Sequence, residues 1–230
     1  EAAREDILKH LNVVPDLVRA VHLAAQDAYT PTPAPNDEEM RRSLSLPPHY
    51  LLYHGGFDIR KNLKTLFEAF YIAHRSGVDA KLVVGGRLPS ADTSFAPDPR
   101  RLAQETGLPE GAVRFLGFIP ERAVPAVYRG AHTFVYPSVY EGFGLPALEA
   151  LACGVPVVGS HATSVPEVVG DAGILLDPHD AEGMAGALIQ LLNDQAFHTE
   201  LSRRARRQAG RFDWQRTAAA TLTAYQAALR

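Results

Sequence analysis

The feature that most constrains this fold is a series of six short apolar segments that begins at Tyr50. Stretches with helical periodicity lie between most of these segments. Strands that are apolar along their whole length are buried on both faces, which is typical of a parallel sheet between two layers of helices. The sequence therefore predicts an α/β fold with a doubly wound parallel sheet. The expected strands are 50–54, 81–85, 113–117, 133–137, 155–159 and 173–177.

The clearest helical segment is NLKTLFEAFYIAH, residues 62–74, with Asn62 as the expected N-cap. Its buried face is expected to carry Leu63, Leu66, Phe67 and Phe70. Asp213 is a good N-cap for the last of three further helices at the end of the chain. These three helices are expected at 180–194, 196–210 and 213–230.

Composition excludes several classes of protein. The net charge of −3 provides no general attraction to nucleic acid or to an anionic membrane. A single cysteine, Cys153, excludes an internal disulfide and fits a reducing compartment, and it is expected to be buried. No apolar run approaches the ~20 residues of a membrane span. We therefore expect a cytoplasmic protein that does not bind nucleic acid, and peripheral membrane association of the full-length protein stays open.

Residues 137–160, PSVYEGFGLPALEALACGVPVVGS, contain two acids on either side of a glycine-rich helix start. Pro146 is favoured in the first turn of a helix, and Gly154 is a natural residue for its C-terminal end. A helix is therefore expected from near Leu145 to Gly154. The two acids, Glu141 and Glu149, then lie before the helix and in its second turn.

The start of this helix has the properties of an anion site. A helix N-terminus offers free N–H groups and a partial positive charge, and Gly142 and Gly144 let an anion approach the backbone. Glu149 lies about 6 Å further along the same helix face, where a carboxylate can accept hydrogen bonds from ribose hydroxyls. Glu141 could accept hydroxyls of a second sugar. Alone, Glu149 is more simply a partner for the helix dipole and Glu141 an ordinary loop charge, but together they describe a site for a sugar–diphosphate–nucleoside.

The stretch YEGFGLPALEALACGVPVV resembles the Glu-x7-Glu motif of retaining GT-B glycosyltransferases, specifically family 4, the glycosyl transferases group 1. The resemblance extends from about residue 50 to the end and implies the Rossmann-like C-terminal donor-binding domain. It implies that Glu141 contacts the donor sugar and that Glu149 contacts the ribose. The backbone amides expected to hold the distal phosphate are those of Phe143, Gly144 and Leu145.

A second motif, HGGFDIRKN (54–62), joins the first strand to the first helix. Gly55 and Gly56 are expected to permit a tight turn. Arg60 and Lys61 stand before a helix N-terminus, where two cations can neutralise a diphosphate leaving group, although an exposed basic turn is the alternative. Many members of the family carry Arg where this chain has Gly56, which leaves Arg60 and Lys61 to hold the phosphates. The form GGFDxRKN resembles branches that often use GDP-mannose.

Other residues at strand ends complete the expected donor site. Gly85 ends the second strand at the carboxyl edge, where doubly wound sheets bind ligands. The resemblance places Gly117, Phe118 and Ile119 beside the nucleobase, and a strand-end turn with a core Phe is the alternative. Ser138 is expected to donate to a phosphate.

Three other features are expected to be structural. Ser164 and Glu167 have capping-box spacing. Four arginines between residues 203 and 207 indicate a solvated helix face. The histidines lack convincing metal-ligand partners, so no metal and no cofactor is expected. The expected ligand is the donor substrate itself, a GDP- or UDP-linked sugar.

The resemblance also divides the chain. Residues 1–30 resemble the last helix and strand of the N-terminal GT-B domain, residues 31–45 a linker, 46–212 the nucleotide-sugar-binding domain and 213–230 the crossover helix. Because the chain begins with Glu1 and lacks most of the N-terminal domain, it is interpreted as a fragment that is inactive alone.

The predicted activity of the full protein is retaining transfer of a hexose, with mannose from GDP-mannose as the expected donor, to an unknown acceptor. A non-catalytic nucleotide-sugar-binding module and a GT-B sugar-nucleotide epimerase are the alternatives. A dinucleotide-dependent oxidoreductase is disfavoured because no G-x-G-x-x-G follows the first strand.

Overall fold

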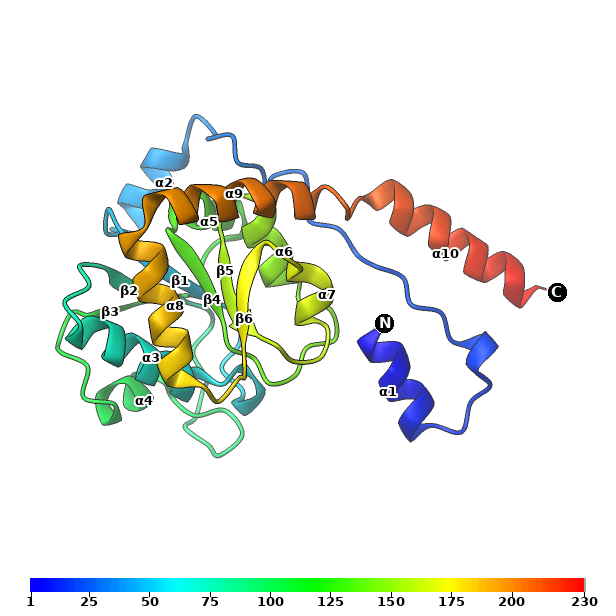
Figure 1. Ribbon diagram of the computed structural model, residues 1–230, viewed down its shortest axis with the longest axis horizontal. Coiled ribbons are helices and arrows are strands. Elements are labelled where there is room, and N and C mark those ends of the chain that lie inside the picture. Colours follow the sequence, from blue (N-terminus) through cyan, green and yellow to red (C-terminus); the bar gives the residue numbers. More distant parts are fainter. Residues whose placement is uncertain (230) are drawn as a thin grey trace.

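The computed structural model describes residues 1–229 and contains a six-stranded parallel sheet with helices on both faces (Figure 1). The strand order β3-β2-β1-β4-β5-β6 reverses direction between β1 and β4. In doubly wound sheets, ligands bind at the carboxyl ends of the strands beside such a reversal. The predicted fold class is confirmed. The strands are β1 (Tyr50–His54), β2 (Lys81–Gly85), β3 (Val113–Gly117), β4 (Thr133–Tyr136), β5 (Val157–Ser160) and β6 (Gly173–Leu176).

The helices alternate with the strands, as the apolar pattern predicts. Short 3₁₀ segments are η1 (Pro15–Leu17), η2 (Ile59–Lys61) and η3 (Glu121–Ala123). The helices are α1 (Ala2–His10), α2 (Asp37–Ser43), α3 (Leu63–Arg75), α4 (Pro99–Glu105), α5 (Val124–Gly130), α6 (Leu145–Ala152), α7 (Val165–Val169), α8 (Ala181–Asn193), α9 (Gln195–Ala209) and α10 (Trp214–Ala228).

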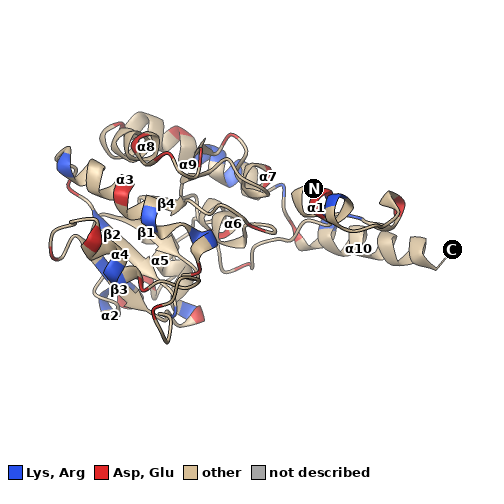
Figure 2. Ribbon diagram, turned by 90° about the horizontal axis from the view of Figure 1, so that it is seen from below, with Lys and Arg blue, Asp and Glu red and all other residues tan. Residues whose placement is uncertain are grey.

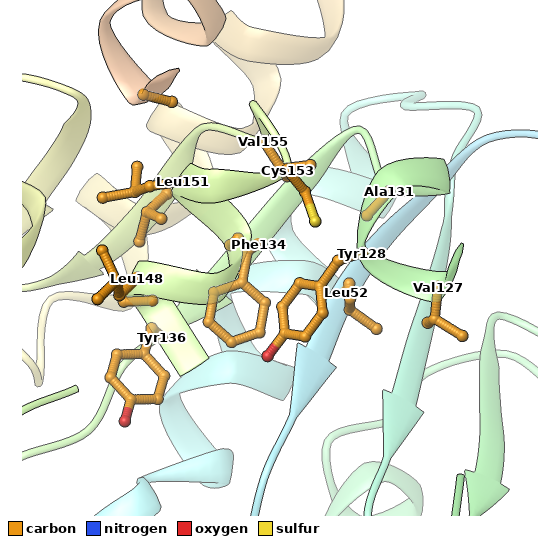
Figure 3. Packing of buried hydrophobic residues seen from close by; sticks show 14 of the residues in the cluster. Leu52, Val127, Tyr128, Ala131, Phe134, Tyr136, Leu148, Leu151, Cys153 and Val155 are labelled. Atoms are coloured by element: carbon orange, nitrogen blue, oxygen red, sulfur yellow. The ribbon is translucent and has the colours of Figure 1, made fainter. Parts of the chain in front are cut away.

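The core is divided into two layers by the sheet. Along β1, Tyr50 and Leu52 pack towards α5 and α6, whereas Leu51 and Tyr53 pack towards α3 and α8. This alternation follows from the two-residue period of a strand, and it explains why the strands are apolar throughout. Figure 3 shows part of the layer formed with α5 and α6, in which the aromatic rings of β4 and α5 lie together.

Helix α3 buries the four residues that its periodicity predicts, and Asn62 occupies its N-cap position but makes no side-chain cap bond. Asn62 has a left-handed backbone with φ 54°, and its side-chain amide donates to the carbonyl oxygens of Pro137 and Pro178. The side chain therefore ties the loops after β4 and β6 to the start of α3. Asp213 does cap α10, because its Oδ1 accepts from the N–H of Arg216 at 2.8 Å.

Residues 1–25 and α10 form an extension beside the sheet (Figure 1). The strand expected within residues 1–30 is absent from the described chain, and residues 18–26 instead run along α10 without sheet pairing. Thr217 Oγ1 donates to His22 O at 2.8 Å, and Trp214 Nε1 donates to Ala25 O at 3.1 Å. Helix α10 has no buried residue and is almost free of charged side chains (Figure 2).

The expected linker, residues 31–45, contains α2, which packs against α5. Asp37 of α2 is buried and pairs through both carboxylate oxygens with Arg129, at 2.6 and 2.7 Å. Arg129 also donates to the carbonyl oxygens of Ala28 and Thr30, and its hydrogen bonds lower the pKa of Asp37. This group, the Asp37–Arg129 clamp, fixes residues 28–37 to the sheet domain.

Two further expectations are met at the surface and in the core. The arginines of α9 lie on an exposed face, where Arg203 and Arg204 pair with Glu200 and Arg207 pairs with Asp171. Cys153 is buried, and burial raises the pKa of its thiol to about 12. Among residues 1–229, none of the helices combines the length and the apolar character that crossing a membrane requires.

Candidate functional site

The glycine-rich loop before α6 presents a row of free backbone amides. Helix α6 begins at Leu145, as predicted, and Gly144 at its N-cap has φ 100°, a conformation that other residues adopt only with strain. The N–H groups of residues 142–145 have no hydrogen-bond acceptor within residues 1–229. Unpaired donors at the positive end of a helix dipole are suited to binding an anion.

Lys61 and Glu141, 80 residues apart in sequence, meet directly beside this loop. Lys61 Nζ donates to Glu141 Oε1 at 2.7 Å, and the two side chains are only 18% and 11% exposed. The N–H of Val139 donates to the carbonyl oxygen of Arg60 at 2.8 Å, which joins the loop after β4 to η2. The structure thus brings together the predicted sugar-contacting acid and one of the two predicted cations.

Arg60 has a different environment from Lys61. Its guanidinium is half exposed and bonds Asp58, with Nε 2.8 Å from Oδ1. Asp58 also accepts the backbone N–H of Arg60 and so starts η2. In this structure Arg60 is therefore paired within its own turn and does not contact Glu141.

Gly55 and Gly56 do not form the expected turn through glycine-specific backbone angles, because neither has a positive φ. Glycine is instead required at Gly86, where φ is 146° and a Cβ would lie 2.1 Å from the carbonyl oxygen of Gly55. A Cβ at Gly85 would lie 2.5 Å from Ile119 Cδ1. The ends of β1 and β2 therefore depend on close backbone packing, and the strand-end glycines shape this edge of the sheet.

Glu149 occupies a largely buried position in the second turn of α6. Burial raises the pKa of Glu149 to about 7, although the hydroxyls of Tyr29 and Tyr128 act in the opposite direction. The Tyr128 hydroxyl also lies 3.3 Å from Nδ1 of His54, the last residue of β1, and burial lowers the pKa of His54. Sequence reasoning missed Tyr29, Tyr128 and His54, and only the position of His54 at a strand end could have indicated one of them.

Two hydroxyl side chains hold the backbone of Glu141. Thr163 Oγ1 accepts the N–H of Glu141 at 2.9 Å, and Ser164 Oγ donates to its carbonyl oxygen at 2.8 Å. Thr163 has φ 48°, an unusual value for a β-branched residue. The expected capping box is wrong, because Ser164 makes no cap bond to α7 and Glu167 instead accepts the N–H of Ala2 at 2.7 Å.

The residues proposed around the nucleobase separate into exposed and buried positions. Gly117 has φ 67°, and Phe118 is 63% exposed with the Arg87 guanidinium 5.4 Å from its ring centroid. The alternative of a strand-end turn fits Gly117, but Phe118 is not a core residue, because Ile119 fills the core position. Ser138 is completely buried, so its hydroxyl reaches no surface-bound phosphate in this conformation.

A cleft of 190 Å³ lies between the glycine-rich loop and the extension. Gly142, Phe143 and Ser164 line one side, and residues from α1 and from 18–22 line the other. The predicted anion site therefore opens towards the residues that precede the sheet domain.

The family model described as glycosyl transferases group 1 matches residues 36–208, which is most of the chain. The chain belongs to the group 1 glycosyltransferases. The predicted membership of the glycosyl transferases group 1 and the predicted GT-B-type domain fold are therefore confirmed.

Two curated relatives illustrate this similarity. The O-antigen chain mannosyltransferase B of Escherichia coli is 36% identical over 226 residues, which cover 97% of this chain and 58% of the relative. A D-inositol 3-phosphate glycosyltransferase of Corynebacterium aurimucosum is 35% identical over 224 residues, covering 94% and 52%. The chain spans about half the length of these relatives.

Solved structures show the same fold. Sucrose-phosphate synthase from Thermosynechococcus elongatus has a TM-score of 0.79 at 27% identity, covering 99% of this chain and 56% of that one. A C-terminal domain of a glycosyl transferase group 1 protein from Francisella tularensis has a TM-score of 0.67 at 27% identity, covering 81% and 97%. Anabaena HepE in complex with UDP and glucose has a TM-score of 0.80 at 20% identity, covering 97% and 60%, and shows the fold alone.

Proposed function

We propose that this chain is the donor-binding part of a retaining family 4 glycosyltransferase that transfers a hexose from a nucleotide diphosphate sugar. The observation that carries the proposal is the Lys61–Glu141 pair beside four unpaired amides at the start of α6. A cation and helix amides suit a diphosphate, and a carboxylate suits sugar hydroxyls. The relatives named above are transferases, which favours transfer over the non-catalytic module and the epimerase.

The chemistry follows from where charge develops. When the bond between sugar and diphosphate breaks, negative charge grows on the leaving diphosphate. Preformed donors aimed at that charge stabilise the transition state without reorganising. We assign this role to Lys61, to Arg60 once it leaves Asp58, and to the amides of residues 143–145. Glu141 orients the sugar and does not act as a nucleophile.

The nucleoside is assigned to the other side of the loop. Glu149 accepts the ribose hydroxyls, and Phe118 with Arg87 offers an exposed surface beside the base. Mannose from GDP-mannose is our preferred donor, supported by the GGFDxRKN sequence and by the similarity to a mannosyltransferase. We propose no metal or cofactor, a cytoplasmic location, and an acceptor bound mainly by residues outside this chain.

Isothermal titration calorimetry of the 230-residue chain with GDP, UDP and GDP-mannose tests the proposal. Lys61→Ala is expected to weaken binding of all diphosphates by roughly 1–3 kcal/mol, because it removes a charged hydrogen-bond donor. Lys64→Ala is the matched control, since Lys64 lies on the exposed surface of α3. Failure of the folded wild-type chain to bind any of the three ligands at millimolar concentration would refute the donor site.

A further inference from the structure

Two buried hydroxyls without partners lie directly below the candidate donor site. Among residues 1–229, four buried side-chain polar atoms lack a hydrogen-bond partner, and two of them are Tyr136 Oη and Ser138 Oγ. Both residues are at most 1% exposed. A buried polar group without a partner costs about 1–3 kcal/mol, so the presence of two at one place points to a use in another state of the site.

Tyr136 is fixed by its ring and free at its hydroxyl. The ring stacks on Phe134 with a centroid distance of 5.5 Å, and Figure 3 shows its oxygen directed away from Phe134 and Leu148. On its other side, the ring edge lies beneath the glycine-rich loop, since a Cβ at Gly144 would be 3.8 Å from Tyr136 Cε1. The Tyr136 hydroxyl therefore lies under the loop that carries Glu141.

Glu141 is the nearby group that needs such a donor. The Tyr136 hydroxyl lies close to both the Glu141 carboxylate and the Ser138 hydroxyl, although it forms no regular hydrogen bond with either. Burial and the Glu141 carboxylate raise the pKa of Tyr136, so the hydroxyl keeps its proton as a donor at neutral pH. In the structure Lys61 holds Glu141. A diphosphate competes for Lys61 with two or more negative charges, and its arrival would leave Glu141 as an unpaired, mostly buried carboxylate.

We propose that Tyr136 is a positioning residue whose hydroxyl donates to the Glu141 carboxylate, assisted by Ser138, when a diphosphate takes Lys61. The Lys61–Glu141 pair is the donor-free arrangement, and the Glu141–Tyr136 hydrogen bond is the donor-bound one. When Tyr136 replaces Lys61 as the partner of Glu141, one carboxylate oxygen of Glu141 is held and the other can accept a sugar hydroxyl. This inference rests on the proposed donor site and concerns how its acid is oriented.

The test compares two buried tyrosines that differ in one respect. Tyr50 and Tyr136 are both 1% exposed, but the Tyr50 hydroxyl donates to Val127 O at 2.6 Å, whereas that of Tyr136 has no partner. Tyr136→Phe should leave the urea unfolding midpoint unchanged or raised, because no hydrogen bond is lost, and Tyr50→Phe should lower it. Calorimetry with GDP and with GDP-mannose then measures the contribution of the sugar.

Tyr136→Phe should weaken GDP-mannose binding about tenfold while changing GDP binding less than twofold, because only the sugar depends on Glu141. Tyr50→Phe should leave the ratio of the GDP-mannose affinity to the GDP affinity unchanged. If Tyr136→Phe lowers the unfolding midpoint as Tyr50→Phe does and leaves the ratio of the two affinities intact, the inference is wrong although the donor site stands. If wild type binds neither ligand, the proposed function and this inference fail together.

Discussion

Replacing Glu149 with Gln is predicted to stabilise the fold and weaken nucleotide binding at the same time. Burial raises the pKa of this carboxyl from 4.5 to about 7. For an acid whose pKa is higher in the folded state, the charged form is the destabilising one. The loss of stability from burying the ionised carboxylate is therefore absent below pH 4.5, develops between pH 4.5 and about 7, and is complete above pH 7.

The size of this effect follows from the shift. Each pKa unit corresponds to about 1.36 kcal/mol, so the free energy of unfolding of wild type should fall, relative to Glu149→Gln, by roughly 2 kcal/mol between pH 5 and pH 8. Gln cannot ionise, and it retains a similar shape. Comparison with the variant removes the contributions of other titrating groups, such as His54 and His132, whose pKa values are lowered by burial.

Urea unfolding of both proteins at several pH values between 5 and 8.5 measures the difference directly. Calorimetry with GDP should show weaker binding to Glu149→Gln by roughly tenfold, because charged hydrogen bonds to the ribose are lost. Wild-type affinity for GDP should also fall as the pH drops below 7. A stability difference that does not vary with pH would refute the argument that Glu149 is destabilised by burial of its charge.

Three other predictions concern the surrounding scaffold. Gly144→Ala should cost about 1–2 kcal/mol of stability because φ is 100°, whereas Gly186→Ala, in open space within α8, should gain roughly 0.5–1 kcal/mol in the same denaturation assay. Asp37→Ala should lower the free energy of unfolding by about 3 kcal/mol, since Arg129 is left buried and unpaired, and equal stability would contradict this. The thiol of Cys153, with its pKa raised to about 12, should react with a thiol reagent at pH 8 only after unfolding, and rapid modification of the native chain would show that it is accessible.

The strands and helices of the sheet domain were predictable because burial on both faces leaves a continuous apolar pattern. The limits of α6 were also predictable, because Pro146 and Gly154 act locally on the backbone. The position of Asn62 at the N-cap of α3 was predictable, but the partners of its side chain were not. Its side chain bonds carbonyl groups 75 and 116 residues away, and no local pattern reports such partners.

The candidate site shows the same division. The motif identified Glu141 and the amides at the start of α6, whose roles depend on residues that are adjacent in the sequence. The supports of Glu141, Thr163 and Ser164, come from the loop after β5, and the capping-box spacing suggested a different role for Ser164. Tyr29 is a neighbour of Glu149 only through tertiary packing of residues 28–37, which the Asp37–Arg129 clamp holds in place. Tyr128 reaches Glu149 through the packing of α5 against α6.

The contacts between residues 18–25 and α10 have a mechanical consequence. Because Thr217 and Trp214 donate hydrogen bonds to the backbone of that segment, residues 18–25 and α10 would move relative to the sheet as one rigid unit. Two segments, residues 26–30 and 210–213, join the extension to the sheet domain, and such a turn would pivot about them. The extension is also tied to the sheet domain at its far end, where Glu167 accepts the N–H of Ala2 and Asp6 accepts the hydroxyl of Tyr140, so such a turn would have to break these bonds.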